Sequence, residues 1–325
     1  MSTRDHVRRT PWTNALAVLL LAGLLAGSGA CGTDAKRAGS KYPAGMGEAE
    51  ADTLLQSYAK DRADTEEWLK SSPTSYLATV QRRDFGDQST LTVGSAAGND
   101  VRIEDPAVMP QHLRITVVGD SFRVETIDRG ARFQVKDVEM TLTTVPPSGI
   151  KVGRFSLRLS HQRFPAIIVF DPQSPRFELY KGIPYFPPDL SYHIVAALTP
   201  NPKADTTVIL STRGNQRRAV RVGWFDFKLN GARCRLEATR LLEPGVGEKD
   251  FGLFFTDATS GKESYHLGRY LEAAPRPDGR YVLDFNLCYS PACAYSEHYN
   301  CPIPPRENRL KVAIRAGEMD PRYMH

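Results

Sequence analysis

One stretch of the C-terminal half gathers many of the side chains that catalyse reactions in proteins. Asp257, His266 and Asp284 are candidate acids or bases, and Arg269 is a candidate anion-binding group because its guanidinium offers a planar fork of donors. Together they suggest the polar pocket of a hydrolase-type enzyme. The segment from Asp257 to Gly261 also has the residue types of a tight turn, in which Asp and Thr side chains bond to nearby backbone. Both interpretations remain open.

The chain has five cysteines, of which four follow Cys31. Cys293 and Cys301 flank a short loop and, in an oxidising compartment, favour a disulfide. Two alternatives use the same thiols. A zinc site would add His266 and His298, although the usual spacing of a zinc-binding cysteine pair is only about two to four residues. A cysteine nucleophile with a histidine base is the other alternative. We expect no metal and no cofactor.

The N-terminus has the pattern of an export signal. Three arginines precede an apolar run from Ala15 to Ala26, which is shorter than the roughly 20 residues that span a membrane. The small residues Gly27 to Ala30 then lead to Cys31, in a pattern that resembles the lipobox of bacterial lipoproteins. We predict a signal peptide over 1–30, lipidation of Cys31 and a membrane-anchored lipoprotein at the cell envelope. A secreted or periplasmic soluble protein is the alternative, since the same stretch suits ordinary signal peptidase cleavage.

Hydrophobic periodicity divides the rest of the chain into one helix and a long β-rich part. Residues 31–47 are rich in Gly, Ala, Lys and Ser and are predicted to form a flexible tether. Apolar residues at helical spacing predict an amphipathic helix over 48–72. Short alternating runs between Gly, Asp, Asn and Pro turns predict a β-sandwich over 73–174, and a second β-rich domain over 175–325. The predicted fold class is mainly β.

Composition excludes several classes of protein. Hydrophobic residues make up 41% and charged residues 24%, as in soluble globular domains, so a disordered, collagen-like or coiled-coil chain is excluded. The net charge of +5 is small, and basic residues are scattered among acidic ones, so no nucleic-acid partner is expected. The chain has no P-loop, dinucleotide-binding glycine fingerprint, nucleophile-elbow serine or paired metal-ligand histidine motif, which removes the commonest enzyme classes.

One block of the predicted sandwich resembles a forkhead-associated domain. The resemblance rests on Leu91–Ser95, Asn99–Ile103 and Asp105–Leu113. It implies an eleven-stranded β-sandwich over about Tyr76 to Asp171. In that family an Arg after the glycine turn and a Ser three residues before a His hold phosphothreonine. Here those positions are Ser95 and Met109, before His112, so the resemblance argues against a phosphopeptide partner.

The C-terminal half resembles the bacterial domain of unknown function 1684, over roughly Pro175 to Met319. The matching blocks are Gly182–Pro187, Thr212–Gly214, Arg221–Gly223, Phe255–Gly261, Tyr265–Leu271, Asp284–Asn286, Pro291–Tyr295, Cys301–Pro305, Asn308–Leu310 and Ala316–Glu318. Members look like secreted or lipid-anchored proteins with a forkhead-associated-like sandwich in front, and their activity is not established. Within these blocks the candidate ligand-binding residues are Tyr265, Arg269, Asn286, Tyr295 and Asn308.

Two cysteines depart from that family pattern. Cys234 and Cys288 stand on predicted strands of the same domain, which suggests a bridge between them, and Cys293 and Cys301 would then form the second pair. The resemblance implies no reaction. We therefore expect a binding or scaffolding module with an unknown envelope ligand or protein partner, and keep a hydrolase-type enzyme as the alternative.

Overall fold

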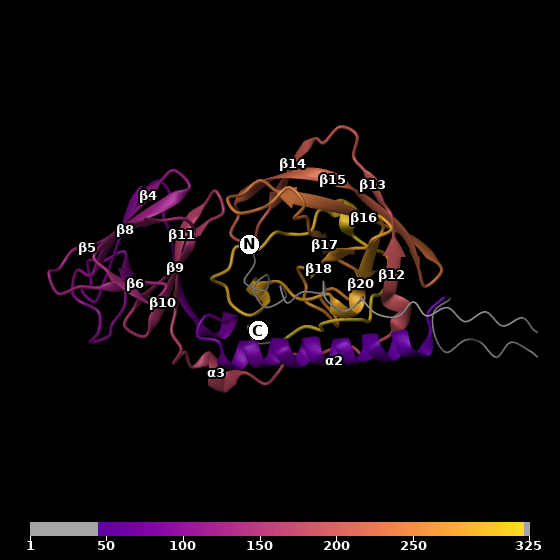
Figure 1. Cartoon of the computed structure of the whole chain (residues 1–325), viewed down its shortest axis with the longest axis horizontal. Helices are drawn as coiled ribbons and strands as arrows, with labels where there is room; N and C mark the ends of the chain where they lie inside the picture. The colour runs from indigo at the N-terminus through magenta and orange to yellow at the C-terminus, as the bar shows by residue number, and fades with distance from the viewer. Residues whose placement is uncertain (1–44, 322–325) are drawn as a thin grey trace, which may run out of the picture.

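The computed structural model describes residues 45–321. The predicted signal peptide, the lipidation site Cys31 and most of the predicted tether lie outside these residues. The described chain is mainly β, as predicted, with several sheets and few helices. Figure 1 shows a β-sandwich at one end, a larger β-rich region at the other and a long helix beneath that region. Within residues 45–321 no helix is long and apolar enough to cross a membrane.

Helix α2 (Glu48–Ser71) is amphipathic and contributes one buried face. Acidic Glu48 and Glu50 lie in its first turn and Lys70 in its last turn, which complements the helix dipole. Its buried residues recur at helical spacing: Ala51, Tyr58, Thr65 and Leu69. The chain leaves the helix at Ser72, directly before a proline that would not continue it.

The sandwich has one six-stranded sheet, in the order β1-β11-β10-β9-β6-β7, and one five-stranded sheet, in the order β3-β2-β4-β5-β8. All pairs are antiparallel except β2 with β3. Alternate residues of β10 are buried, as expected for a strand with one face on a core. The strands are β1 (Thr79–Asp84), β2 (Thr90–Gly94), β3 (Val101–Arg102), β4 (Leu113–Val118), β5 (Ser121–Thr126), β6 (Phe133–Val135), β7 (Val138–Met140), β8 (Leu142–Val145), β9 (Ser148–Val152), β10 (Phe155–His161) and β11 (Pro165–Phe170).

The C-terminal β region is built around a long hairpin of β15 and β16, with a bulge between Arg221 and Gly223. β13 and β14 flank β15, while β12, β20 and β19 form a second sheet and β17 pairs with β18. The strands are β12 (His193–Ala196), β13 (Leu198–Pro200), β14 (Thr206–Leu210), β15 (Gln216–Leu229), β16 (Ala232–Leu241), β17 (Leu253–Phe255), β18 (Arg269–Leu271), β19 (Ala273–Pro275) and β20 (Tyr281–Asp284). The short helices are α3 (Arg176–Leu179), η2 (Tyr76–Ala78), η3 (Leu190–Tyr192), η4 (Phe285–Leu287), η5 (Ala292–Ala294) and η6 (Arg306–Asn308).

Helix α2 precedes the sandwich in sequence but packs on the C-terminal β region (Figure 1). The Tyr58 hydroxyl donates to Asp284 at 2.6 Å, and Arg62 donates to the Phe186 carbonyl at 2.9 Å. The predicted helix is therefore an integral part of the C-terminal fold rather than a separate element.

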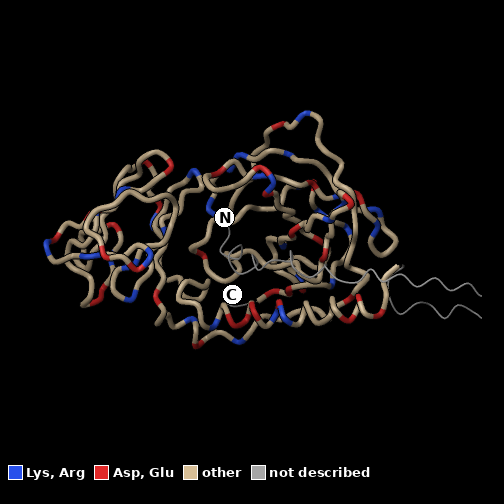
Figure 2. The backbone as a smooth tube through the Cα atoms, viewed as in Figure 1, with Lys and Arg blue, Asp and Glu red and all other residues tan. Residues whose placement is uncertain are grey.

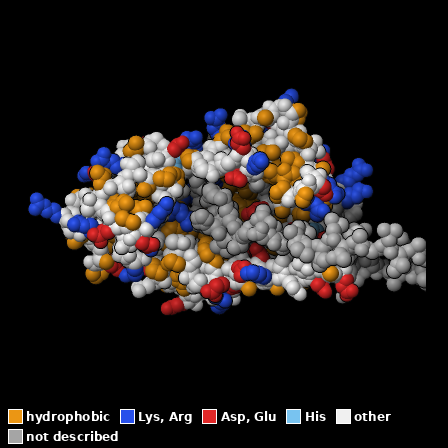
Figure 3. All heavy atoms as spheres, viewed as in Figure 1, with side chains coloured by type: hydrophobic (Ala, Val, Ile, Leu, Met, Phe, Trp, Pro, Cys, Tyr) orange, Lys and Arg blue, Asp and Glu red, His pale blue; other side chains and the backbone are white. Residues whose placement is uncertain are grey.

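The sandwich docks on the same region through β1. Thr79 hydrogen-bonds to Tyr299 at 2.8 Å, and Arg213 forms an ion pair with Asp84 at 3.0 Å. Figure 2 shows basic and acidic residues interspersed along both parts of the chain. The space-filling view likewise shows charged side chains interspersed with apolar ones on the visible face (Figure 3). The cavity described below lies where the sandwich docks on the C-terminal β region.

Candidate functional site

The predicted polar cluster is a buried structural network. Arg269 on β18 and Asp257 form an ion pair of 2.7 Å in which both side chains are fully buried. The guanidinium also donates to the carbonyls of Ile314 and Ala316 at 2.7 and 2.6 Å, and to that of Glu318 at 3.1 Å. Arg269 therefore ties the C-terminal segment to β18, and its donors are directed at protein acceptors.

The second carboxylate oxygen of Asp257 is also hydrogen-bonded to groups of the protein itself. It accepts from the Thr259 backbone at 2.7 Å, from the Thr259 hydroxyl at 2.6 Å and from the Ile314 backbone at 3.2 Å. Gly261 completes the turn with φ +77°, a conformation that favours glycine. The turn interpretation of this segment accounts for Asp257, Thr259 and Gly261 without a ligand.

Asp284 belongs to a different set of partners. It accepts from Tyr58 of α2 and hydrogen-bonds to His193 Nδ1 at 2.8 Å, while its other oxygen accepts from the Asn286 backbone. Burial, together with the Asp284 carboxylate, raises the pKa of Tyr58. His266 is exposed, with its ring 4.6 Å from that of Tyr265. The structure thus brings Asp257 and Arg269 together but places His266 at the surface.

The remaining predicted ligand-binding residues hold neighbouring segments of the protein. Tyr265, Asn286, Tyr295 and Asn308 are all buried. Their partners are the Cys293 carbonyl for Tyr265, the Asp189 backbone for Asn286, the Glu318 carboxylate for Tyr295, and the carbonyls of Glu237 and Phe254 for Asn308. These residues position loops rather than face an open cavity.

The structure has no disulfide among the described residues: Cys234, Cys288, Cys293 and Cys301 are free thiols, and the two predicted pairings stay predictions. The Cys234 sulfur lies 4.0 Å from the Ala232 carbonyl, whereas the Cys288 sulfur contacts the Ala316 carbonyl at 3.4 Å. These two thiols are therefore directed at different acceptors. Cys293 and Cys301 are neighbours, since the Cys293 backbone N–H donates to the Cys301 sulfur at 3.3 Å. Within the described part of the chain, no three His, Cys, Asp or Glu residues are grouped so as to hold a metal ion.

The block of the sandwich that contains Met109 and His112 adjoins a small cavity. His112 Nδ1 accepts from the Met109 backbone at 2.9 Å, and its Nε2 lies 2.8 Å from the Arg132 carbonyl. This cavity, of about 250 Å³, is lined by both Met109 and His112. His112 ties two loops together, and the exposed Met109 brings a thioether where the family has a hydroxyl.

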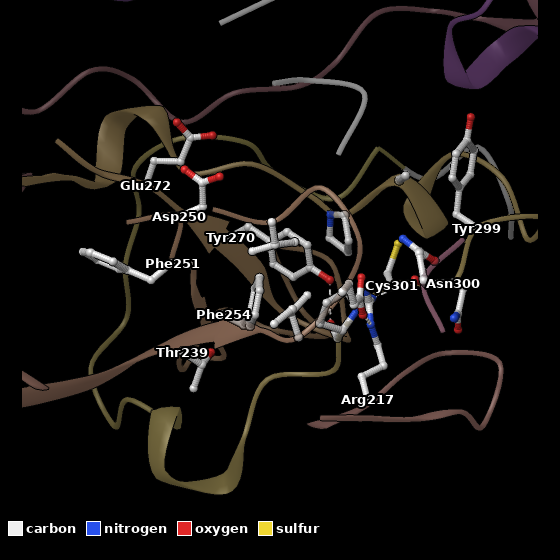
Figure 4. Close-up of a pocket in the computed structure, with 18 of the residues that line it drawn as sticks. Arg217, Thr239, Asp250, Phe251, Phe254, Tyr270, Glu272, Tyr299, Asn300 and Cys301 are labelled. Carbon is white, nitrogen blue, oxygen red and sulfur yellow. Dashed lines mark hydrogen bonds and ion pairs between the residues drawn. The ribbon is translucent and has the colours of Figure 1, made fainter. Parts of the chain in front are cut away.

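A larger cavity, of about 430 Å³, lies where the sandwich meets the C-terminal β region. Its volume is within the range of small-molecule sites, roughly 300–1,000 Å³. β1 and β10 of the sandwich contribute Arg82 and Arg158, and the C-terminal region contributes aromatic and polar residues from β16 to the loop before η6. Figure 4 shows Phe254 and Tyr270 at its centre, with Arg217, Asn300 and Cys301 on one side.

The three arginines of this cavity differ in their partners. Arg217 forms a buried two-bond ion pair with Glu243, at 2.5 and 2.6 Å. Arg82 is paired with Asp84 at 2.7 Å.

Arg158 is the third arginine and has no such carboxylate. Its guanidinium lies 4.9 Å from the Phe170 ring centre, and among residues 45–321 its charge interactions are with Tyr76 and Tyr299. Burial lowers the pKa of Arg158 because no acidic neighbour compensates for the lost hydration. Of the three cavity arginines, Arg158 is therefore the one without a carboxylate partner among the described residues.

Two neutral side chains of the same cavity are also unsatisfied. The Thr239 hydroxyl, and both the amide nitrogen and the amide oxygen of Asn300, are buried without a hydrogen-bond partner in the described structure. Buried polar groups are normally paired, since an unpaired one costs about 1–3 kcal/mol. Hydroxyl or amide groups of a ligand are suitable partners for the Thr239 hydroxyl and for the Asn300 amide.

Sequence reasoning did not find this site. Arg158, Thr239 and Asn300 come from β10, β16 and a loop that are distant in sequence, and no local motif links them. Of the cavity residues, only Cys301 was a candidate. Strand alternation in β10 places Arg158 on the face opposite to the buried Leu157 and Leu159, but that pattern does not reveal that a second domain covers this face.

The described chain is a mainly β protein with a cavity between its sandwich and its C-terminal β region, and sequence comparison relates the C-terminal part to a family. Residues 178–319 match the family described as "Protein of unknown function (DUF1684)". The chain belongs to this family through these residues. No functionally curated protein matches the chain.

Two solved structures are similar to parts of the chain. An uncharacterized protein of Haloarcula marismortui, determined by solution NMR, is 35% identical over 47% of this chain and 85% of its own, with a TM-score of 0.38. Mycobacterium tuberculosis EmbR in complex with a low affinity phosphopeptide is 11% identical over 38% of this chain and 30% of its own, with a TM-score of 0.21.

Proposed function

We propose that the protein is a binding module whose cavity between the two β domains takes a small anionic molecule. The observation that supports this most directly is Arg158, a half-buried cation without a carboxylate partner among the described residues, in a cavity of about 430 Å³. A carboxylate or phosphate would supply the missing charge with a planar or forked set of acceptors. Thr239 and Asn300 would bond to neutral polar groups of the same molecule.

The aromatic wall supports a ligand with an apolar or ring portion. Phe254 and Tyr270 pack edge to face with ring centres 4.6 Å apart, and both line the cavity. The Tyr270 hydroxyl is occupied by the Pro302 carbonyl at 2.5 Å. Only the ring surface of Tyr270 therefore remains for a ligand, and such surfaces favour flat apolar groups.

We also infer that the sandwich is forkhead-associated-like and serves the cavity rather than a phosphopeptide. The two sheets of six and five strands, with β2 parallel to β3, support this assignment. Ser95 and Met109 replace the phosphate-gripping residues of that family. The contribution of the sandwich to binding would instead be Arg158, which projects from β10 toward the C-terminal region.

The proposed localisation rests on the N-terminal sequence pattern alone. We propose export by the signal over 1–30 and lipid anchoring at Cys31, with the tether holding the two β domains near the envelope surface. Fractionation of the native host tests this. Wild type should sediment with membranes and Cys31→Ala should appear in the soluble exported fraction, whereas an unprocessed wild-type chain in the cytoplasm would contradict export.

Calorimetric titration with inorganic phosphate and with benzoate tests the binding proposal. Wild type should bind at least one of them saturably, and Arg158→Gln should weaken binding by roughly tenfold or more, as loss of a charge-assisted contact predicts. Arg163→Gln is the matched control, since Arg163 lies on the same sandwich but is exposed and paired with Asp120 at 3.1 Å. Equal affinities of the two variants for the anion would refute Arg158 as its site.

A further inference from the structure

The four described thiols fall into two chemically different pairs. Cys234 and Cys288 are packed in the core of the C-terminal β region, and burial raises the pKa of both, to about 12 for Cys288. Cys301 lines the cavity, and Cys293 adjoins it. Thiolate, not thiol, is the reactive form of cysteine, so the first pair is inert and the second has access to a ligand.

Cys301 is held rigidly by its own backbone. Its N–H donates to the Thr212 hydroxyl at 3.0 Å, and its carbonyl accepts from the Thr212 backbone at 2.9 Å. The Cys301 sulfur accepts the Cys293 backbone N–H at 3.3 Å. Figure 4 shows this sulfur beside Asn300, on the same side of the cavity as Arg217.

The two neighbouring thiols have unequal acidity. Hydrogen bonds from the Cys293 side chain and backbone, together with the Arg217 charge, lower the pKa of Cys301 despite its burial. The bond to Cys301, followed by burial, raises the pKa of Cys293. The Tyr265 hydroxyl lies 3.8 Å from the Cys293 sulfur and can donate a hydrogen bond to the Cys293 thiolate. Cys301 is therefore the thiol expected to attack a substrate first, and Cys293 the thiol expected to resolve the mixed disulfide on Cys301.

We propose that Cys301 and Cys293 form a redox-active dithiol that reduces a small anionic disulfide bound in the cavity. The Cys301 thiolate attacks one sulfur of RS–SR, so that a Cys301–SR bond forms while the RS–SR bond breaks and RS⁻ leaves. Cys293 then attacks the Cys301 sulfur and expels the second RS⁻, which takes up the Cys293 proton. Two protein thiols become one disulfide as the substrate gains two electrons. The anionic character of the substrate rests on the proposed function of Arg158; the dithiol does not.

The probe is 5,5′-dithiobis(2-nitrobenzoate), a disulfide whose two aromatic rings carry carboxylates. Reduced wild-type protein should release two coloured thiolates per chain in a fast phase and retain none of the reagent in its intact mass. Cys293→Ser should release one and retain the other as a mixed disulfide on Cys301. Cys301→Ser should slow the fast phase by roughly tenfold or more, because the more acidic thiol, which lines the cavity, is lost. Cys234→Ala, in the core, is the matched control and should react as wild type does.

Two results overturn the dithiol: a wild-type chain that retains the reagent, or a Cys293→Ser variant that retains none. The anion site is tested separately by neutral 4,4′-dithiodipyridine. Arg158→Gln should slow the reaction with the dianionic probe by about tenfold and leave the reaction with the neutral one unchanged. Equal rates of Arg158→Gln and wild type with the dianionic probe would remove Arg158 from the reaction, while two-thiolate release without retention would still uphold the dithiol.

Discussion

Replacing Arg269 with Met distinguishes a structural network from a catalytic one. Arg269 and Asp257 are fully buried at 2.7 Å, and the substitution would leave Asp257 uncompensated and three carbonyls without their donor. Removing one partner of a buried ion pair costs about 3–5 kcal/mol. For a folded region of more than 250 residues each kcal/mol lowers the melting temperature by about 2 °C, so Arg269→Met should lower it by roughly 6–10 °C.

The control is Arg235→Met on the exposed side of the long hairpin. Arg235 pairs with Asp226 at the same 2.7 Å, but their side chains are 64% and 53% exposed, so this pair is worth about 0–1 kcal/mol. Differential scanning calorimetry of both variants measures the effect of burial at constant chemistry. Adding Asp257→Asn to Arg269→Met should recover part of the loss, because it removes the isolated charge. If the two single variants melt at similar temperatures, the network does not stabilise the fold, and the hydrolase-type interpretation of Asp257 and Arg269 regains its support.

Three further measurements address other parts of the chain. Tyr58→Phe removes the 2.6 Å bond from α2 to Asp284 and should cost about 1.5–3 kcal/mol in urea unfolding, because hydrogen bonds to charged acceptors are the stronger ones; an unchanged midpoint would separate α2 from the fold. Burial raises the pKa of Asp84, but the bonds from Arg82 and Arg213 lower it overall below 3.8, so its stability contribution is present above about pH 4 and lost as the pH falls; Asp84→Asn should flatten that acid slope. The alkylation rate of Cys301 in the wild-type chain should rise at a lower pH than that of free cysteine, because the bonds from the Cys293 side chain and backbone and the Arg217 charge lower its pKa; an ordinary thiol profile would contradict its acidity.

Local patterns were sufficient where a segment makes its own structure. The helix over 48–72 was predicted from apolar spacing, and Tyr58 and Leu69 of that pattern are buried. The central residues of most strands were likewise predictable from local sequence, because the alternation of apolar and polar residues is visible within a few residues. Alternating residues also predict a strand over Leu310 to Ile314, but this segment forms no strand, although its two end residues are buried. That segment is fixed by tertiary bonds, including the one from Arg269 to the Ile314 carbonyl, and alternation alone does not distinguish such a segment from a strand.

Strand boundaries depended on features that periodicity does not carry. The alternating pattern predicts two strands here, Ala219–Val222 and Trp224–Leu229, but in the structure both belong to one continuous strand, β15. Gly223 interrupts the pattern, but it is needed because a side chain there would meet the Thr199 carbonyl of β13 at 2.3 Å. The glycine was interpreted as a break when it marks a close approach of two strands. A glycine that ends a strand and a glycine at a close approach of two strands can be told apart only from the position of the partner strand, here β13, which is not visible in the local sequence.

The candidate site shows the same division between local and long-range information. Asp257, Arg269 and Asp284 were predicted to be functional because residue types common in catalysis lie near one another in the sequence. Proteins use the same residue types to stabilise turns and to hold segments together. The cavity residues Arg158 and Asn300 form no motif, since β10 and the loop after η5 meet only when the sandwich docks on the C-terminal region. A buried group with every bond satisfied has little left to offer a ligand, whereas an unpaired arginine and an unpaired amide have unmet bonds. Unsatisfied groups, rather than catalytic residue types, are therefore what locate the site of this protein.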